Sequence, residues 1–131
     1  MTVKEITIKS QANGKGNGGN ELDENLIKKY IPMTETTYYT LLAVTDKRHG
    51  YAIMQYVSDL TKGRIQLGTG TLYTMVGRLT TDGIIEIAPN DEGKKSYLIT
   101  ETGRLLLQME TERLEKQLKD GHEVIDGKRE G

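Results

Sequence analysis

The sequence predicts a mainly α-helical fold with one small β-hairpin, in the α+β class. Apolar side chains recur at three- and four-residue spacing over several segments, which is the period of helices that bury one face. Near residues 84–99 the period changes, and a run of isoleucines, the turn-forming segment PNDEG and a second apolar run follow one another. That order is typical of a hairpin. The length of 131 residues fits one folded domain with tails.

Three helices are predicted ahead of the hairpin. Residues 34–46 form the first, which Thr34 can cap. Residues 51–60 form the second, which ends at a Lys-Gly pair typical of helix C-termini. The third ends at Asp82-Gly83 and has the clearest helical stripe in the chain, which consists of Leu72, Met75, Val76 and Leu79.

A last helix is predicted over residues 100–118, with apolar side chains on two opposite sides at about 100° per residue. One side can cover the hairpin and the preceding helices, and it consists of Leu105, Leu106 and Met109. The other side has no partner left in so short a chain, and it consists of Leu107, Leu114 and Leu118. A second subunit is therefore the expected partner, and these three leucines are the predicted homodimer interface.

The predicted organisation has four parts. Residues 1–25 form a flexible N-terminal arm, because the Gly- and Asn-rich stretch 10–20 has almost nothing apolar to bury. Residues 26–99 form the helical domain with its hairpin, residues 100–120 the C-terminal dimerisation helix, and residues 121–131 a disordered tail. Three helices, a hairpin and a further helix, in this order, make a winged helix-turn-helix.

The composition excludes several classes of function. The chain has no Cys and only two His, so disulfides are impossible, and we expect no metal site and no cofactor. No apolar run reaches the ~18 residues of a membrane span, and no signal-peptide pattern is present. We therefore expect a cytoplasmic protein that contacts no membrane. No arrangement of nucleophile, base and acid is recognisable, so an enzyme is not expected.

Short motifs follow one another in a fixed order along the chain. An HGY motif at residues 49–51 opens the second helix, and a GTLY motif at residues 70–73 opens the third. The other matching residues are Ile53-Met54, Gly63-Arg64, Leu67-Gly68, Arg78-Leu79, Asp82-Gly83-Ile84-Ile85, Tyr97, Thr100-Glu101 and Gly103. This combination, over roughly residues 26–118, resembles the PadR-like family of transcriptional regulators, in the subfamily with one short C-terminal helix.

The resemblance implies a homodimeric regulator of double-stranded DNA, often a repressor on a partly palindromic operator, with release by a small-molecule effector as a further expectation. Some members bind planar aromatic drugs between aromatic side chains at the dimer interface. This chain has neither Trp nor Phe, and Leu114 stands where an aromatic is needed, so that activity is not carried over. The family often has a basic residue before Arg78, where this chain has Gly77, which removes one candidate phosphate contact.

The candidate DNA contacts form three groups. The first lies on the outward face of the third helix, opposite its apolar stripe, and consists of Thr69, Thr71, Tyr73, Thr74 and Arg78. Thr can contact a base edge or a phosphate, and Arg can pair with guanine. The second group, Lys94 and Lys95, sits at the hairpin tip, where a point charge suits a phosphate. The third group lies at the start of the second helix and consists of Arg48, His49 and Tyr51.

Each group also has a purely structural interpretation. Polar helix faces are ordinarily solvated, Thr71 can serve as a cap, and turns are ordinarily charged. Arg48 can be solvated, His49 can hold the turn before the second helix, and core packing is the favoured single role for Tyr51. The alternative function is a winged-helix protein-interaction module without DNA binding. Two observations favour it: the formal net charge is -1, and Gly77 stands where the family often has a basic residue.

Overall fold

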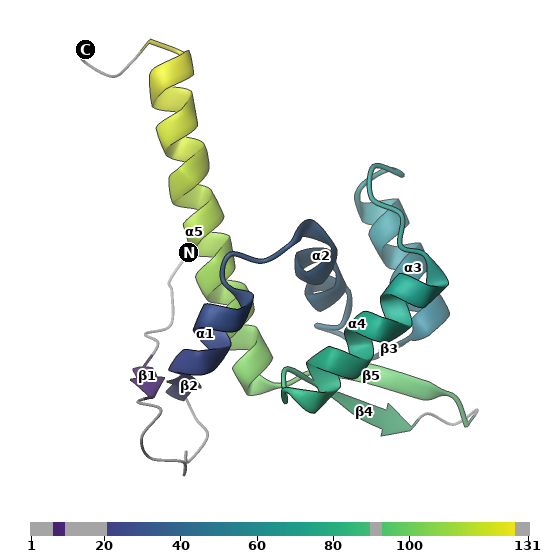
Figure 1. Cartoon of the computed structure of the whole chain (residues 1–131). Coiled ribbons are helices and arrows are strands. Elements are labelled where there is room, and N and C mark those ends of the chain that lie inside the picture. Colours follow the sequence, from purple (N-terminus) through teal and green to yellow (C-terminus); the bar gives the residue numbers. More distant parts are fainter. Residues whose placement is uncertain (1–6, 10–20, 90–92, 128–131) are drawn as a thin grey trace.

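The computed structural model describes residues 7–9, 21–89 and 93–127. It places a small cluster of helices on a short sheet, with one long C-terminal helix beside them (Figure 1). At the N-terminus, strands β1 (Thr7–Lys9) and β2 (Glu21–Asp23) pair in parallel. Helix α1 (Glu24–Tyr30) follows at once, because the Asp23 carboxylate caps it by accepting a hydrogen bond from the Asn25 amide at 2.8 Å.

Three helices form the centre of the domain: α2 (Glu35–Ala43), α3 (Gly50–Leu60) and α4 (Thr69–Thr81). They agree with the three predicted helices. The Thr34 hydroxyl caps α2 by accepting from the Thr37 amide at 3.1 Å. The helices meet in a single apolar core, whose fully buried members include Leu41, Ile53, Val57, Leu72 and Leu79.

The predicted hairpin is present as strands β4 (Ile85–Pro89) and β5 (Lys95–Ile99). A third, two-residue strand, β3 (Arg48–His49), pairs with β5, which gives an antiparallel sheet in the order β3-β5-β4. β3 comes immediately before α3, so the hairpin is joined by backbone hydrogen bonds to the start of that helix. The chain is therefore mainly α-helical with a small antiparallel sheet, as predicted.

Helix α5 (Glu101–Ile125) begins at Thr100, whose hydroxyl accepts from the Gly103 amide at 3.1 Å. Its first turns pack against the core through Leu105 and Leu106, which are fully buried. The Tyr38 and Thr111 hydroxyls, 2.8 Å apart, join it to α2. Beyond this point the helix stands clear of the other elements (Figure 1).

The structure corrects the predicted boundaries at both ends. The arm was expected to reach residue 25, but Leu22 in β2 is fully buried and α1 starts at residue 24, because these residues cover the core beside α5. The tail was expected to begin at residue 121, but α5 continues to Ile125. The remainder of both predicted segments, residues 1–6, 10–20 and 128–131, lies outside the described residues.

One of the three predicted interface leucines lies in the interior of its own chain. Leu107 is 8 % exposed and belongs to the core. Helix α5 contacts both β2 and α2, and β2 was not among the predicted elements. Leu114 is half-buried and Leu118 is 61 % exposed, so only the later part of the predicted interface remains accessible.

Within the part of the chain that the structure describes, no helix is long and apolar enough to cross a lipid bilayer. Across those same ranges, 7–9, 21–89 and 93–127, no cluster of three or more His, Asp and Glu side chains is placed to hold a metal ion.

Candidate nucleic-acid interface

Helix α4 has one apolar face and one polar face, as its sequence predicts. The apolar stripe is buried in the core and consists of Leu72, Met75, Val76 and Leu79. The opposite face is exposed and holds the whole first group of candidate contacts, namely Thr69, Thr71, Tyr73, Thr74 and Arg78. Gly68 is the N-cap and no side chain caps the helix. Thr71 lies inside the first turn, so the interpretation of Thr71 as the cap is wrong.

The hairpin of β4 and β5 is the wing of this fold. The start of α3 and the β5 side of the wing meet α4 around one surface hollow of about 450 Å³. Five of the predicted contact residues line it: His49, Tyr51, Tyr73, Lys94 and Lys95. The fold thus brings together members of all three groups, from segments more than 40 residues apart in the sequence. A hollow that combines three tyrosines, two lysines and an imidazole offers donors and positive charge to a phosphate.

Core packing was the favoured single role for Tyr51, but the structure places this side chain on the surface. Its side chain is 67 % exposed, whereas Ile53 and Val57 form the buried side of α3. Tyr73 from α4 is also partly exposed, at 47 %. These two tyrosines are partly exposed on the surface of a small domain, where an external partner can contact them.

Gly50 leaves room for the Tyr73 side chain at the start of α3. A Cβ atom at this position would lie 2.7 Å from Cζ of Tyr73 and would contact the Tyr73 hydroxyl still more closely. Only a residue without a side chain leaves room for the tyrosine there. The glycine of the HGY motif and the tyrosine of the GTLY motif are therefore two halves of one helix contact.

The two remaining residues of the third group differ in role. His49 is the N-cap of α3, and its Nδ1 accepts a hydrogen bond from the Ala52 amide at 3.4 Å, so it holds the turn while also lining the hollow. Arg48 is not part of the hollow. Its guanidinium donates to the Ala43 carbonyl at 2.6 Å and lies 4.0 Å from the centre of the Tyr56 ring, so it is held at the end of α2.

A second hollow, of about 490 Å³, lies on the other side of the exposed face of α4. Thr71, Thr74 and Arg78 line it from α4, and Thr34 and Thr36 line it from the start of α2. The two residues near α2 were not among the predicted contacts. The signal for them was present in the sequence, since a Thr that caps one helix places its hydroxyl at the domain surface.

Helix α1 is joined to the end of α4 by a small polar cluster. The Asp82 carboxylate accepts from the Tyr30 hydroxyl at 2.6 Å and pairs with the Lys29 ammonium at 2.8 Å. The hydrogen bond from Lys29, followed by that from Tyr30, lowers the pKa of Asp82 below its ordinary value. Burial, together with the hydrogen bond to Asp82, raises the pKa of Tyr30 to about 12. Asp82 is therefore ionised and Tyr30 neutral at ordinary pH.

Comparisons with known proteins identify the family. Residues 40–109 match the transcriptional regulator PadR-like family. The chain belongs to this family. Over 70 residues it is 30% identical to a transcriptional regulator from Escherichia coli, called YqjI. The match covers 53% of this chain and 34% of that protein, so the chain spans about a third of the length of the curated relatives it matches.

Solved structures show the same fold. A transcriptional regulator from Clostridium thermocellum has a TM-score of 0.55 at 22% identity, with 79% of this chain and 97% of that chain covered. A PadR-family transcriptional regulator from Eggerthella lenta has a TM-score of 0.54 at 25% identity, with 69% of this chain and 76% of that chain covered. The predicted winged helix-turn-helix fold is thus confirmed, and membership of a regulator family confirms that the chain is not an enzyme.

Proposed function

We propose that this PadR-like regulator binds double-stranded DNA as a homodimer and represses transcription from a partly palindromic operator. The observation that carries the proposal is the hollow where α4, the start of α3 and the wing meet. Candidate contacts that are scattered through the sequence converge there on one surface. In a winged helix-turn-helix, this surface faces the duplex when α4 enters the major groove.

The residues divide between reading bases and holding phosphates. Thr74 lies near the middle and Arg78 near the end of the exposed face of α4, where their side chains could reach base edges in the major groove. Tyr51, Lys94 and Lys95 stand at the edge of that face, where the phosphate backbone would pass. Gly77 lies on the same exposed face with no atom within 4 Å of the place of a Cβ, so α4 presents a gap rather than a charge beside Arg78.

The accessible part of α5 supports the homodimer. Leu114, Leu118, Gly121 and Ile125 are spaced by four, three and four residues, which places them on one stripe of the helix. Leu118 and Ile125 are 61 % and 83 % exposed. The C-terminal half of α5 extends away from the other labelled helices and strands (Figure 1). A second copy of α5, antiparallel or parallel, would bury it, whereas a single chain leaves it in water.

Operator selection tests the proposal. Duplexes retained from a random pool are sequenced, and the preferred duplex and a scrambled one are then titrated with protein at several salt concentrations. Arg78→Ala should weaken binding to the preferred duplex by about 1–3 kcal/mol and affect the scrambled duplex less. Lys94→Ala with Lys95→Ala should weaken both alike and reduce the salt slope by up to about one unit for each lost phosphate contact.

Lys116→Ala serves as the matched control for lost positive charge. Lys116 is exposed on α5 and lies about 200° around that helix from Leu114, so its loss should leave both affinities unchanged. A palindrome among the selected sequences supports symmetric binding. If a folded wild-type protein retains no duplex at low salt, DNA binding is wrong and the alternative, a protein-interaction module, takes its place.

Sedimentation tests the homodimer separately. Leu118→Asp should dissociate the dimer, because it would bury an unpaired carboxylate, and Lys116→Asp should leave the dimer intact. If the wild-type chain sediments as a folded monomer at micromolar concentration, the homodimer is wrong, whatever the outcome with DNA.

A further inference from the structure

Helix α4 carries a basic and an acidic side chain one turn apart at its end. Arg78 is exposed, and Asp82 is the C-cap of the helix. Side chains four residues apart on a helix are neighbours, so Arg and Asp in this relation can form an ion pair. Such a pair would take up the guanidinium of Arg78 within its own helix. The same donors would then be lost to a bidentate contact with guanine.

The structure does not form this pair, and α1 holds the carboxylate instead. Oδ2 of Asp82 accepts from the Tyr30 hydroxyl at 2.6 Å and lies 2.8 Å from Nζ of Lys29. The two contacts direct the carboxylate toward α1, and the ammonium of Lys29 offsets its charge. In the part of the chain that the structure describes, no carboxylate forms an ion pair with Arg78.

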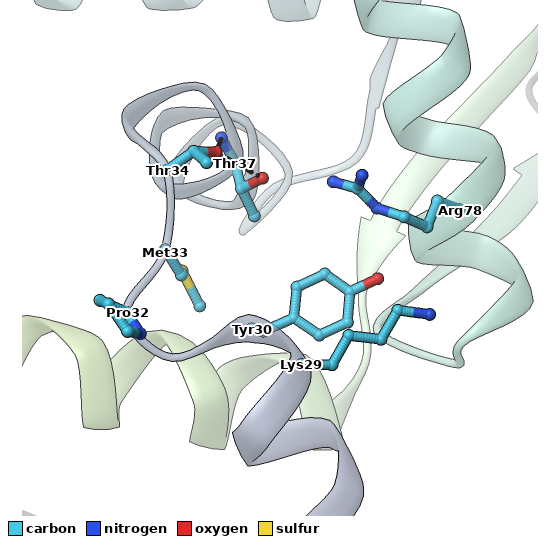
Figure 2. Close-up of a pocket in the computed structure, with 7 residues that line it drawn as sticks. All are labelled: Lys29, Tyr30, Pro32, Met33, Thr34, Thr37 and Arg78. Atoms are coloured by element: carbon cyan, nitrogen blue, oxygen red, sulfur yellow. Dashed lines mark hydrogen bonds between the residues drawn. The ribbon is translucent and has the colours of Figure 1, made fainter.

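The ring of Tyr30 gives the guanidinium a different neighbour. The central carbon of the Arg78 guanidinium lies 5.7 Å from the ring centre, which is within the range of a cation–π contact. The ring lies between the side chains of Arg78 and Lys29 (Figure 2). Tyr30 is 5 % exposed, so the ring is fixed in place. An aromatic face restrains the guanidinium and leaves its N–H donors available to an acceptor outside the chain.

The carboxylate of Asp82 depends on α1 for its compensation. It stands at the C-terminus of α4, where the helix dipole disfavours negative charge. The hydrogen bonds from Lys29 and then from Tyr30 lower the pKa of Asp82 most, and the charge of Arg78 contributes less. Arg78 is thus close enough to interact with this carboxylate. Without the two contacts from α1, it would be the cation that remains beside an ionised Asp82.

We propose that Lys29 and Tyr30 are positioning residues for DNA recognition. By holding the Asp82 carboxylate on α1, they keep the Arg78 guanidinium out of an ion pair within α4 and available to a base. The inference rests on the proposed DNA binding, in which Arg78 reads a base edge. Helix α1 thereby contributes to sequence preference through Arg78, without a contact of its own to the duplex.

The double variant Lys29→Gln with Tyr30→Phe removes both contacts to Asp82 and keeps the aromatic ring. Its affinity for the selected duplex should fall about two- to five-fold, the range of an ion pair between partly exposed groups. The scrambled duplex should be affected less, so the ratio of the two affinities falls. Lys28→Gln is the matched control, because it removes the same charge from an exposed position of α1. It should leave the ratio unchanged, and thermal melting checks that each variant is folded.

Addition of Asp82→Asn to the double variant provides the decisive test. It removes the carboxylate that would hold Arg78, so the ratio of the two affinities should return to the wild-type level. A merely structural role of the contact between α1 and α4 predicts a further loss from the third substitution. In an Arg78→Ala background, the double substitution should no longer change the ratio. Absence of rescue by Asp82→Asn, or a fall in the ratio without Arg78, would overturn the proposal.

The salt dependence separates positioning from direct contact. If Lys29 itself held a phosphate, the double variant would bind both duplexes more weakly by the same factor, and its salt slope would fall by about one unit. Asp82→Asn would then restore neither affinity selectively. That result would also overturn the proposal, because Lys29 would be a phosphate contact.

A measurement on the free protein tests the positioning without DNA. Exchange of the Arg78 Nε proton with water, followed by NMR, should be several-fold slower in the double variant than in wild type, because a hydrogen-bonded N–H is protected. Asp82→Asn should return the exchange to the wild-type rate. Equal exchange in all three proteins would make the positioning wrong, even if DNA binding is right. If exchange changes as expected but no duplex is retained, the DNA-binding function fails while the arrangement of Arg78 stands.

Discussion

The two faces of α4 have opposite environments although they alternate along the same thirteen residues. Leu72, Met75, Val76 and Leu79 are buried at 4 % exposure or less, and the polar residues between them are exposed. On the buried face, side-chain volume decides whether the domain folds. On the exposed face, we propose, side-chain chemistry decides what the domain binds. Stability and recognition should therefore respond to different substitutions only one or two residues apart.

Leu79→Ala should have the largest effect on stability. The side chain is fully buried, and its truncation should lower the free energy of unfolding by about 2–5 kcal/mol, through lost burial and a residual cavity. Thr74→Ala on the exposed face is the control and should change stability by no more than about 0.5 kcal/mol. Urea unfolding measures both. Similar losses in the two variants would contradict the assignment of the faces.

Gly103→Ala extends the comparison to the start of α5. A Cβ there would contact the Ile84 carbonyl oxygen and lie 2.7 Å from Cγ1 of Ile99. Because backbone cannot easily move away, we expect a loss of about 1–3 kcal/mol in stability. Thermal melting checks this. An unchanged melting temperature would mean that α5 does not lie so closely on the β4–β5 sheet.

Asp82→Asn should lower stability by about 1 kcal/mol or less at pH 7, since Lys29 is half exposed and the ion pair is partly screened. The pKa of Asp82 is lower in the folded chain than its ordinary value of 3.8. Its ionised form thus stabilises the fold at pH above that value, and the contribution is lost as pH falls through the folded pKa. Unfolding measured from pH 7 to pH 2 should show wild type losing its advantage over the variant at the acid end.

Gly77→Ala should have the smallest effect, and one of opposite sign. Gly77 lies inside α4 on the exposed face, with nothing within 4 Å of an added Cβ. Alanine has the higher helix propensity, so we expect stability to rise by about 0.5–1 kcal/mol. The same melting experiment as for Gly103→Ala decides the matter. A loss of stability at Gly77 would show that this face of α4 is covered.

The sequence predicted the elements whose signals are local. α2, α3, α4 and the hairpin follow from apolar periodicity and turn residues, and the caps at Thr34 and Thr100 are where their residue types predict. α1 was missed because seven residues are too few for a clear period, although Asp23 before it was a usable capping signal. The burial of Leu22 and Leu107 arises from contacts between distant segments, which no local pattern encodes.

The candidate site was predicted in composition but not in geometry. The family motifs singled out Tyr51 and Tyr73, and apolar spacing placed Tyr73 outward. Tyr51 was a candidate DNA contact, but core packing was favoured as its single role, whereas its side chain is 67 % exposed. Arg48 was grouped with the candidate DNA contacts because it precedes α3, and its hydrogen bond to the Ala43 carbonyl could not be predicted from a local pattern. The ion pair of Lys29 with Asp82 depends on the packing of α1 beside the end of α4, and tertiary packing cannot be predicted from a local pattern.

The short strand β3 has a consequence for the thermodynamics of any ligand that spans the wing and α3. Pairing of Arg48 with Tyr97 and of His49 with Ser96 joins the β5 strand of the wing to the start of α3 through the backbone. Once a ligand is held at one of them, it meets the other at high effective concentration, and the loss of rotational and translational freedom is not incurred a second time. Substitutions at Tyr51 and at Lys95 should therefore be non-additive in a double-mutant cycle, because the two contacts share a single entropic cost that the sheet has fixed in advance.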